Sequence, residues 1–146
     1  MNALSFFSPE EKRQIERSIS QAESMTSGEI RLRVERTCKG ELEKHGIEVF
    51  KKLGMDRTKN RNAVLFYISI KDHQFAVIGD QGINNCVPDG FWNEIYRNIR
   101  TEFSKQNYCF GICMAIIQTG KQLAKYFPID TNDVNELPNE ISFEFE

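Results

Sequence analysis

The stretch that decides the fold is Ala63-Val64-Leu65-Phe66-Tyr67-Ile68-Ser69-Ile70. A run that is apolar at nearly every position is typical of a central strand that is buried on both faces. Lys71-Asp72-His73 has room only for a turn, and Gln74-Phe75-Ala76-Val77-Ile78 follows it as a second strand. Because the connection is so short, the two strands are predicted to form an antiparallel hairpin.

A third strand and a helix precede this hairpin. Glu29 to Glu35 alternates polar and apolar residues, which predicts a strand with one buried face. A helix is predicted from about Gly40 to Leu53, and Gly54 ends it. Its inward side chains are expected to be Ile47, Phe50 and Leu53. A strand that reaches the next one through a helix runs parallel to it with a right-handed crossover, so 29–35 and 63–70 should be parallel.

The N-terminal helix has a strong start signal. Ser8 is suited to be its N-cap, Pro9 occupies the first turn, and Glu11 completes a capping box with the serine. The buried face of this helix is expected to carry Ile15, Ile19 and Ala22.

Two further helices and a tail follow the hairpin. One helix is predicted from Gly90 to about Lys105, and another from about Phe110 to Tyr126. The core side of the second is expected to carry Ile112, Ala115, Ile116, Thr119 and Leu123. The tail from Ile129 to Glu146 is acidic and polar at first, and its alternating end from Ile141 onward predicts a fourth strand at a sheet edge.

Composition is that of an ordinary globular protein. The 146 residues suffice for about one domain with a genuine core. The net charge of −2 gives no electrostatic basis for binding DNA, RNA or an anionic membrane. The N-terminus lacks the basic segment of a secretory signal, and no apolar run approaches the ~20 residues of a membrane span. We therefore expect a cytoplasmic protein without nucleic-acid or membrane partners.

The four cysteines, at positions 38, 86, 109 and 113, do not form a zinc-binding pattern, because no C-x-x-C pair is present. Cys109 and Cys113 are four residues apart in an apolar stretch, which is typical of buried thiols. A tetrahedral zinc site would need four ligands close together, and this spacing does not supply them.

The order helix, strand, helix, strand, strand, helix, helix resembles that of the TPM domain family. The segments that carry the likeness are Thr26 to Arg31, Thr58 to Ile70, Phe75 to Asp89, and Asn135-Glu136-Leu137-Pro138, which is similar to the ending of stand-alone bacterial members. The likeness runs from about Phe7 to Phe145. We therefore predict a single TPM-like domain over residues 1–146, with a core at about 7–128 and a C-terminal tail at 129–146.

The resemblance implies an α/β/α sandwich with a small mixed sheet of three to four strands flanked by about four helices. It also implies a site for a divalent metal, commonly calcium, near the loop after the hairpin. Thylakoid-lumen relatives are linked to photosystem II repair and have been described as acid phosphatases, and many other members are secreted or membrane-anchored. This sequence departs from the family pattern, because Gly79-Asp80-Gln81-Gly82 replaces the usual Gly-aromatic-Gly and is one residue longer.

The best candidate site is the loop from Gly79 to Asp89. It offers two carboxylates, three side-chain amides and glycines that let backbone carbonyls turn inward. Calcium binds six to eight oxygens of these kinds. The predicted topology brings the start of the first strand and the loop from Asp56 to Asn62 to the same end of the sheet. We predict that one or two calcium ions, or another divalent cation, bind there, with the ligands Asp80, Asp89, Glu29, Asn84 and Asp56.

Other interpretations stay open for these segments. The loop residues are also ordinary turn formers, and Asp89 is suited to cap the helix that follows. A second acidic cluster, from Asp130 to Glu136, begins like an EF-hand loop, but Val134 stands where a ligand belongs. It is interpreted as a solvated tail, with a contribution to a second ion as the alternative. Phe91-Trp92 is interpreted as core packing, or as a partner-binding edge if Trp92 is exposed.

The function that the sequence favours is a divalent-metal-binding module with a regulatory or interaction role. The alternative is a metal-dependent acid phosphatase-like phosphomonoesterase, with Asp80 or Asp89 as nucleophile and Arg57 or Arg61 holding the phosphate. Other nucleophilic catalysis finds little support, because neither histidine is predicted to lie beside the acidic loop. A protein-interaction domain with a vestigial site is a third hypothesis.

Overall fold

The computed structural model describes residues 2–129 and 135–144 of the chain. The elements in chain order are η1 (Ala3–Ser5), α1 (Pro9–Glu23), β1 (Glu29–Glu35), α2 (Leu42–Lys52), η2 (Met55–Arg57), β2 (Ala63–Ser69), β3 (Gln74–Gly79), α3 (Gln81–Asn84), α4 (Asn93–Ser104), α5 (Tyr108–Leu123) and β4 (Ser142–Phe143). Every predicted helix and strand is present. The 3₁₀ turns η1 and η2 and the short helix α3 are additional.

The four strands form one mixed sheet in the order β3-β2-β1-β4. β1 is parallel to β2, with Glu29 opposite Ala63, and β2 is antiparallel to β3, with Ser69 opposite Gln74. β4 adds a short parallel pairing on the other side of β1. The predicted hairpin, the parallel crossover and the fourth strand at a sheet edge are therefore confirmed.

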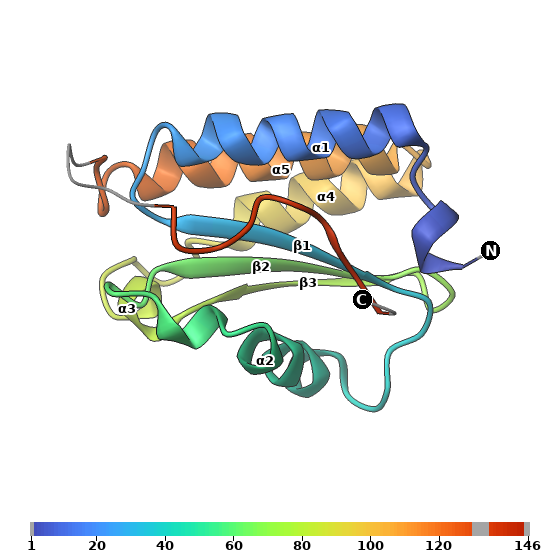
Figure 1. Cartoon of the computed structure of the whole chain (residues 1–146), viewed down its shortest axis with the longest axis horizontal. Coiled ribbons are helices and arrows are strands. Elements are labelled where there is room, and N and C mark those ends of the chain that lie inside the picture. The colour runs from blue at the N-terminus through green and yellow to red at the C-terminus, as the bar shows by residue number, and fades with distance from the viewer. Residues whose placement is uncertain (1, 130–134, 145–146) are drawn as a thin grey trace.

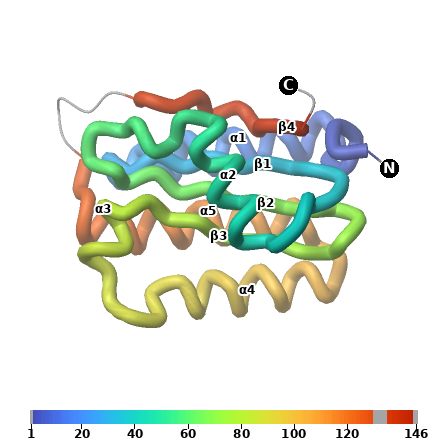
Figure 2. Tube along the Cα trace, turned by 90° about the horizontal axis from the view of Figure 1, so that it is seen from below, coloured from blue at the N-terminus to red at the C-terminus, as the bar shows by residue number. Residues whose placement is uncertain are grey.

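Helices cover both faces of the sheet (Figure 1). α1, α4 and α5 lie on one face, whereas α2 lies on the other, where it is seen in front of the sheet in Figure 2. Val64 and Phe66 of β2 join the core under α1, α4 and α5, and the alternating residues Leu65 and Tyr67 join the core under α2. β2 is buried along its whole length, as its composition predicted. The predicted α/β/α sandwich is confirmed.

α1 begins as the sequence predicts. The Ser8 hydroxyl accepts a hydrogen bond from the N–H of Glu11 at 3.1 Å, and the Glu11 carboxylate accepts one from the N–H of Ser8 at 2.9 Å. This reciprocal capping satisfies two backbone donors at the helix start. The predicted inward side chains are all buried: Ile15, Ile19 and Ala22. Ala22 lies so close to α5 that a Cβ at Gly120 would be 2.8 Å from its side chain.

α5 also agrees with its prediction. Its five predicted core side chains are all buried: Ile112, Ala115, Ile116, Thr119 and Leu123. Cys109 is buried and Cys113 is partly buried, as expected for packed thiols. None of the helices within 2–129 and 135–144 has the length and apolar character needed to cross a membrane.

β1 differs from its prediction, because every residue from Glu29 to Glu35 is buried instead of alternate ones. Its polar side chains share the α2 face of the sheet with the odd-numbered residues of β2. The C-terminal segment 135–144, here called the strap, runs alongside β1 (Figures 1 and 2) and bonds to this polar face. The strap is more than a hundred residues away in the sequence, so the alternation of polar and apolar residues in β1 cannot reveal it. The alternation alone therefore predicted that the polar face is solvated.

α2 is rotated relative to its prediction. Phe50 is buried as expected, but Ile47 is 39% exposed, and Gly46 and Val49 face the sheet instead. Gly46 lies so close to β3 that a Cβ at this position would collide with Ile78. Gly46 has no side chain, so its place on the sheet side of the helix is not visible in the spacing of apolar residues.

The segment between β3 and α4 is more structured than the predicted long loop. α3 interrupts it, and α4 begins three residues after Gly90. Gly90 has a φ of +80°, in the left-handed region that glycine adopts at little cost, so the helix does not extend back to this residue. Trp92 therefore takes the N-cap position of α4, without a side-chain cap, and Asp89 lies outside it.

Candidate metal-binding cleft and the buried Glu35 network

A cleft of about 500 Å³ opens at the end of the hairpin where β2 begins and β3 ends. Its walls come from α2, η2, β3, α3 and α4. Three of the five predicted metal ligands line it: Asp56, Asp80 and Asn84. The structure therefore brings together the two loops that the predicted topology placed at one end of the sheet.

Asp80 is 7% exposed and is bonded in two directions. Its Oδ1 accepts the N–H of Gln81 at 2.8 Å, which caps α3. Arg61 donates through Nε to Oδ2 at 2.7 Å and through Nη2 to Oδ1 at 2.8 Å. A bidentate arginine–carboxylate pair is among the stronger charge-assisted hydrogen bonds. The charge of Asp80 is thus balanced by a cation that the chain itself supplies.

Arg61 is placed beside Asp80 by its backbone. Its φ is +49°, in the left-handed region that few residues other than glycine adopt. The Arg61 carbonyl accepts the N–H of Gly82 at 2.8 Å, and a Cβ at Gly82 would collide with that carbonyl. This contact locks the loop before β2 onto α3. The Arg61 side chain nevertheless stays 38% exposed, so it borders solvent as well as Asp80.

Asp56 lines the same cleft with one oxygen lacking a donor. Its Oδ1 is buried and makes no hydrogen bond with any residue that the structure describes. A desolvated polar atom left unpaired costs roughly 1–3 kcal/mol, and a cation or a water molecule would remove that cost. Asn84 donates through Nδ2 to the carbonyl of Gly79 at 2.9 Å, so its Oδ1 is the atom left to act as a ligand.

Glu29 and Asp89 lie outside this cleft. The Glu29 carboxylate accepts the N–H of Leu137 at 2.7 Å and that of Glu136, so it anchors the strap. Asp89 lines a separate hollow of about 200 Å³ beside α4, which Asn84 also borders. The structure therefore gathers three of the five predicted ligands and leaves two apart.

No group of three or more histidine, cysteine, aspartate or glutamate side chains within 2–129 and 135–144 is arranged to hold a metal ion. The second acidic cluster lies mostly at 130–134, outside the described residues. Phe91 and Trp92 are partly buried and pack against the core, as the packing interpretation expected. Trp92 also forms a wall of the cleft, with Cζ2 2.8 Å from where a Cβ of Gly79 would lie.

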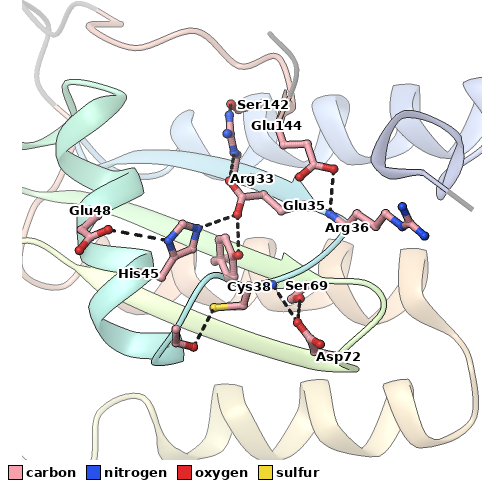
Figure 3. Close-up of polar contacts among 12 residues, drawn as sticks. Arg33, Glu35, Arg36, Cys38, His45, Glu48, Ser69, Asp72, Ser142 and Glu144 are labelled. Carbon is pink, nitrogen blue, oxygen red and sulfur yellow. Dashed lines mark hydrogen bonds and ion pairs between the residues drawn. The ribbon is translucent and has the colours of Figure 1, made fainter.

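A second polar cluster, which the sequence did not predict, surrounds Glu35 at the opposite end of the sheet (Figure 3). Glu35 is 5% exposed. Its Oε1 accepts hydrogen bonds from the Tyr67 hydroxyl and from His45 Nε2, both at 2.7 Å, and its Oε2 accepts one from Arg33 Nε at 2.9 Å. Burial by itself would raise the pKa of Glu35, but these three hydrogen bonds outweigh it and hold the pKa below its ordinary value.

The Glu35 network joins four parts of the fold. Arg33 also donates through Nη1 to the Ser142 hydroxyl at 2.8 Å and to the carbonyl of Phe143 at 2.9 Å. β1, β2, α2 and the strap are therefore connected through one buried carboxylate (Figure 3). The available sequence signal was slight: Arg33 and Glu35 are two residues apart in a strand, which places opposite charges on one face.

Cys38 lies beside this network without being activated. Its N–H donates to Asp72 Oδ2 at 2.8 Å, and its Sγ lies 3.7 Å from the carbonyl oxygen of Gly40. Burial and the negative charges of Asp72 and Glu35 raise the pKa of its thiol. Because the thiolate is the nucleophilic form, a raised pKa makes Cys38 a poor nucleophile at neutral pH.

These observations define a class of protein: an α/β/α domain with a four-stranded mixed sheet and an acidic cleft at one end of its hairpin. The sequence profile of the TPM domain family matches residues 2–122. The chain therefore belongs to the TPM domain family, as its motifs indicated. No curated protein matches the sequence.

Solved structures share this fold. The NMR structure of BA42 from the psychrophilic bacterium Bizionia argentinensis is 40% identical to this chain, with a TM-score of 0.90 over 94% of this chain and 95% of BA42. The N-terminal domain of a P. gingivalis protein is 15% identical, with a TM-score of 0.65 over 83% of this chain and 78% of that domain. The N-terminal domain of cg2496 from Corynebacterium glutamicum is 10% identical, with a TM-score of 0.63 over 89% and 81% of the two chains. The last two likenesses concern the fold alone.

Proposed function

We propose that this chain is a module that binds a divalent cation, calcium above all, in the cleft between η2 and α3. The observation that carries the proposal is the buried Asp56 Oδ1, which has no donor among the described residues and shares the cleft with the Asp80 carboxylate. Asn84 adds an amide oxygen. Carboxylate and amide oxygens are the ligands that calcium prefers.

The residues fit a weakly held cation better than a tightly caged one. Three side-chain oxygens fall short of the six to eight that calcium takes, so water and backbone carbonyls must complete the shell. We therefore expect a dissociation constant on the order of 10⁻⁴ M, in the range of sites with few charged ligands. Such a site suits a regulatory or interaction role, in which binding responds to the concentration of the ion.

Arg61 is the competitor for this site. Its guanidinium already neutralises Asp80, so a metal ion gains the full Asp80 charge only when Arg61 leaves. The Arg61 side chain is 38% exposed, and its departure into solvent needs no rearrangement of the core. Cation binding is therefore proposed to exchange an internal cation for an external one.

Calorimetric titration of chelator-treated protein with calcium, magnesium and zinc tests the proposal. Asp56→Asn should weaken calcium binding by about tenfold or more, since it removes a hard anionic ligand. Glu94→Gln changes an exposed carboxylate on α4 and should leave the affinity unchanged. Asp89→Asn tests whether Asp89, which lies outside the cleft, is also a ligand. An unchanged calcium affinity supports a site within the cleft alone. A loss of affinity equal to that of Asp56→Asn would mean that the ion lies between the two hollows. Parent affinity in Asp56→Asn would overturn the proposed site.

Arg61→Gln provides the complementary test. If the guanidinium competes with the metal, its removal should tighten calcium binding by about three- to tenfold, which corresponds to the strength of a partly exposed ion pair. Arg57→Gln is the matched control, because Arg57 is exposed and does not line the cleft. Weaker calcium binding in Arg61→Gln would mean that the arginine supports the site and does not compete for it.

One observation favours the phosphatase alternative as a second candidate. Arg61 and Lys51 line the same cleft as the two carboxylates, and cationic donors beside a metal can hold a phosphoryl group. The pairing of Arg61 with Asp80 ranks this candidate below the module. Hydrolysis of p-nitrophenyl phosphate, with calcium or magnesium present, should be absent or marginal. A turnover of about 1 per second or more that disappears in Asp80→Ala would replace the module with an enzyme.

A further inference from the structure

A second cavity, of about 390 Å³, lies at the other end of the hairpin from the acidic cleft. It opens among the β2–β3 turn, the end of α4, the start of α5 and the segment after η1. These segments lie together at the end of the molecule that carries the N-terminus in both views of the chain (Figures 1 and 2). None of the predicted metal ligands lines this cavity.

Aromatic rings form most of its apolar wall. Phe6 contacts Tyr108 with ring centroids 5.2 Å apart, Tyr108 contacts Phe103 at 5.1 Å, and Phe103 contacts Phe75 at 5.4 Å. All four side chains remain partly exposed, although they border the core. Ile68 and Ile70 of the hairpin complete the wall. A volume near the lower end of known ligand sites suits one ring or an alkyl chain of similar bulk.

Among the described residues, Arg100 is the one permanently charged side chain that lines the cavity, and no carboxylate within 2–129 or 135–144 lines it. Arg100 has no ion-pair partner among the described residues; its guanidinium lies 5.8 Å from the ring centroid of Tyr96, a neutral contact. An apolar wall with an uncompensated guanidinium matches a ligand that has an apolar body and one anionic end. The guanidinium fork fits the two oxygens of a carboxylate.

We propose that this cavity binds small amphipathic carboxylates, whose apolar body packs against the four rings and whose carboxylate pairs with Arg100. Tyr108 supplies a second polar contact, since its hydroxyl makes no hydrogen bond within the described residues and it lines the same space. The site is independent of the proposed cation cleft, because the two cavities share only Phe75 among their lining residues. The chain therefore carries two ligand sites of opposite charge preference at the two ends of one hairpin.

Titration with octanoate tests the proposal, with octan-1-ol and octylammonium as ligands of the same chain length. NMR signals of the Ile68 and Ile70 methyl groups and of the aromatic rings report binding at the cavity. We expect saturable octanoate binding with a dissociation constant at or below about 1 mM. Octanol should bind about three- to tenfold more weakly and octylammonium more weakly still, and added salt should reduce the octanoate affinity.

Two variants and one control separate the contributions. Arg100→Gln should weaken octanoate binding about three- to tenfold, to the level of octanol, and remove the salt dependence. Arg97→Gln, one turn earlier on the exposed side of α4, should bind octanoate like the parent. Ser104→Trp changes an exposed residue that lines the cavity, and it should abolish binding of both ligands by filling the space.

Three results would overturn the proposal. The first is the absence of saturable shifts at the lining residues with octanoate. The second is equal affinity for octanoate, octanol and octylammonium, which would leave an apolar gap without anion preference. The third is an equal loss of affinity in Arg97→Gln and Arg100→Gln. Because octanoate and calcium are titrated separately, loss of either site is distinguishable from loss of the other.

Discussion

Glu35 and Asp56 lie at opposite ends of the sheet, and their carboxylates differ in how many donors they meet. Donors from β1, β2 and α2 converge on Glu35, whereas the buried Oδ1 of Asp56 meets none among the described residues. A buried acceptor that is fully satisfied holds elements together, and one that is left unpaired costs stability until a ligand arrives. The number of hydrogen-bond donors that reach a buried carboxylate therefore distinguishes a structural cluster from a candidate binding site, even where no catalytic motif is present.

The two arginines at these ends differ in how far their side chains are buried. Arg33, bonded to Glu35, has a side chain that is 7% exposed, whereas Arg61, bonded to Asp80, is 38% exposed. A buried guanidinium cannot leave its partner without stranding a charge. A half-exposed one exchanges its carboxylate for water at small cost. The exposed fraction of the arginine therefore indicates that the Arg61–Asp80 pair opens to solvent at a smaller cost than the Arg33–Glu35 pair.

Removal of the Glu35 charge should have the largest effect on the stability of the protein. Glu35→Gln leaves Arg33 buried without its carboxylate, and breaking one side of a buried pair costs about 3–5 kcal/mol. The free energy of unfolding, measured by urea denaturation, should fall by that amount. Glu41→Gln, an exposed glutamate just before α2, is the control and should change it by less than about 0.5 kcal/mol. Parent stability in Glu35→Gln would refute the structural role of the network.

Asp56→Asn should have a smaller effect of opposite sign. With chelator present, the substitution removes a desolvated charge, so the free energy of unfolding should stay the same or rise by up to about 1 kcal/mol. If the proposed cleft binds calcium, added calcium should stabilise the parent by mass action and should stabilise the variant less. The order of the two urea midpoints should therefore reverse when calcium is added. A loss of more than about 1 kcal/mol in chelator would show that Asp56 has a structural partner.

Lowering the pH should gradually reduce the stability that the Glu35 network provides, and this is the smallest of the expected effects. The three hydrogen bonds hold the pKa of Glu35 below its ordinary value of 4.5, so the unfolded chain takes up a proton at higher pH than the folded chain does. The stabilisation is fully present above that value and is lost as the pH falls through the lower pKa of the folded state. Urea midpoints measured over this range should fall more steeply for the parent than for Glu35→Gln. Equal slopes would mean that Glu35 does not titrate in this way.

Elements whose contacts are close in sequence were predictable. The capping box of Ser8 and Glu11 needs only four consecutive residues, and the alternation of β2 between two cores needs only its own apolar run. The short turn at 71–73 sufficed to orient the hairpin. The meeting of the two loops at one end of the sheet followed from this topology, and it brought Asp56 and Asp80 to one cleft.

Features that depend on distant partners were not predictable. Arg33 bonds to Ser142, 109 residues away, and Glu29 bonds to Leu137, 108 residues away, so the polar face of β1 is covered in part by distant partners. The inward face of α2 was mispredicted, because Gly46 lies against the Ile78 side chain on the sheet side and Val49 turns inward in place of Ile47. The pairing of Arg61 with Asp80 depends on a left-handed backbone at a non-glycine residue, which composition does not reveal.

The strap has a consequence for how the chain is made. Arg33 leaves the ribosome 109 residues before Ser142, which at 5–20 residues per second is a delay of roughly 5 to 20 s. During that interval the hairpin and α2 can assemble, but β1 has an open edge. The face of β1 that the strap later covers carries arginine and glutamate, which water solvates well. It does not carry the apolar residues that attract other nascent chains. We therefore expect the charges of β1 to limit association of the unfinished chain during its synthesis, and they form internal hydrogen bonds once the strap arrives.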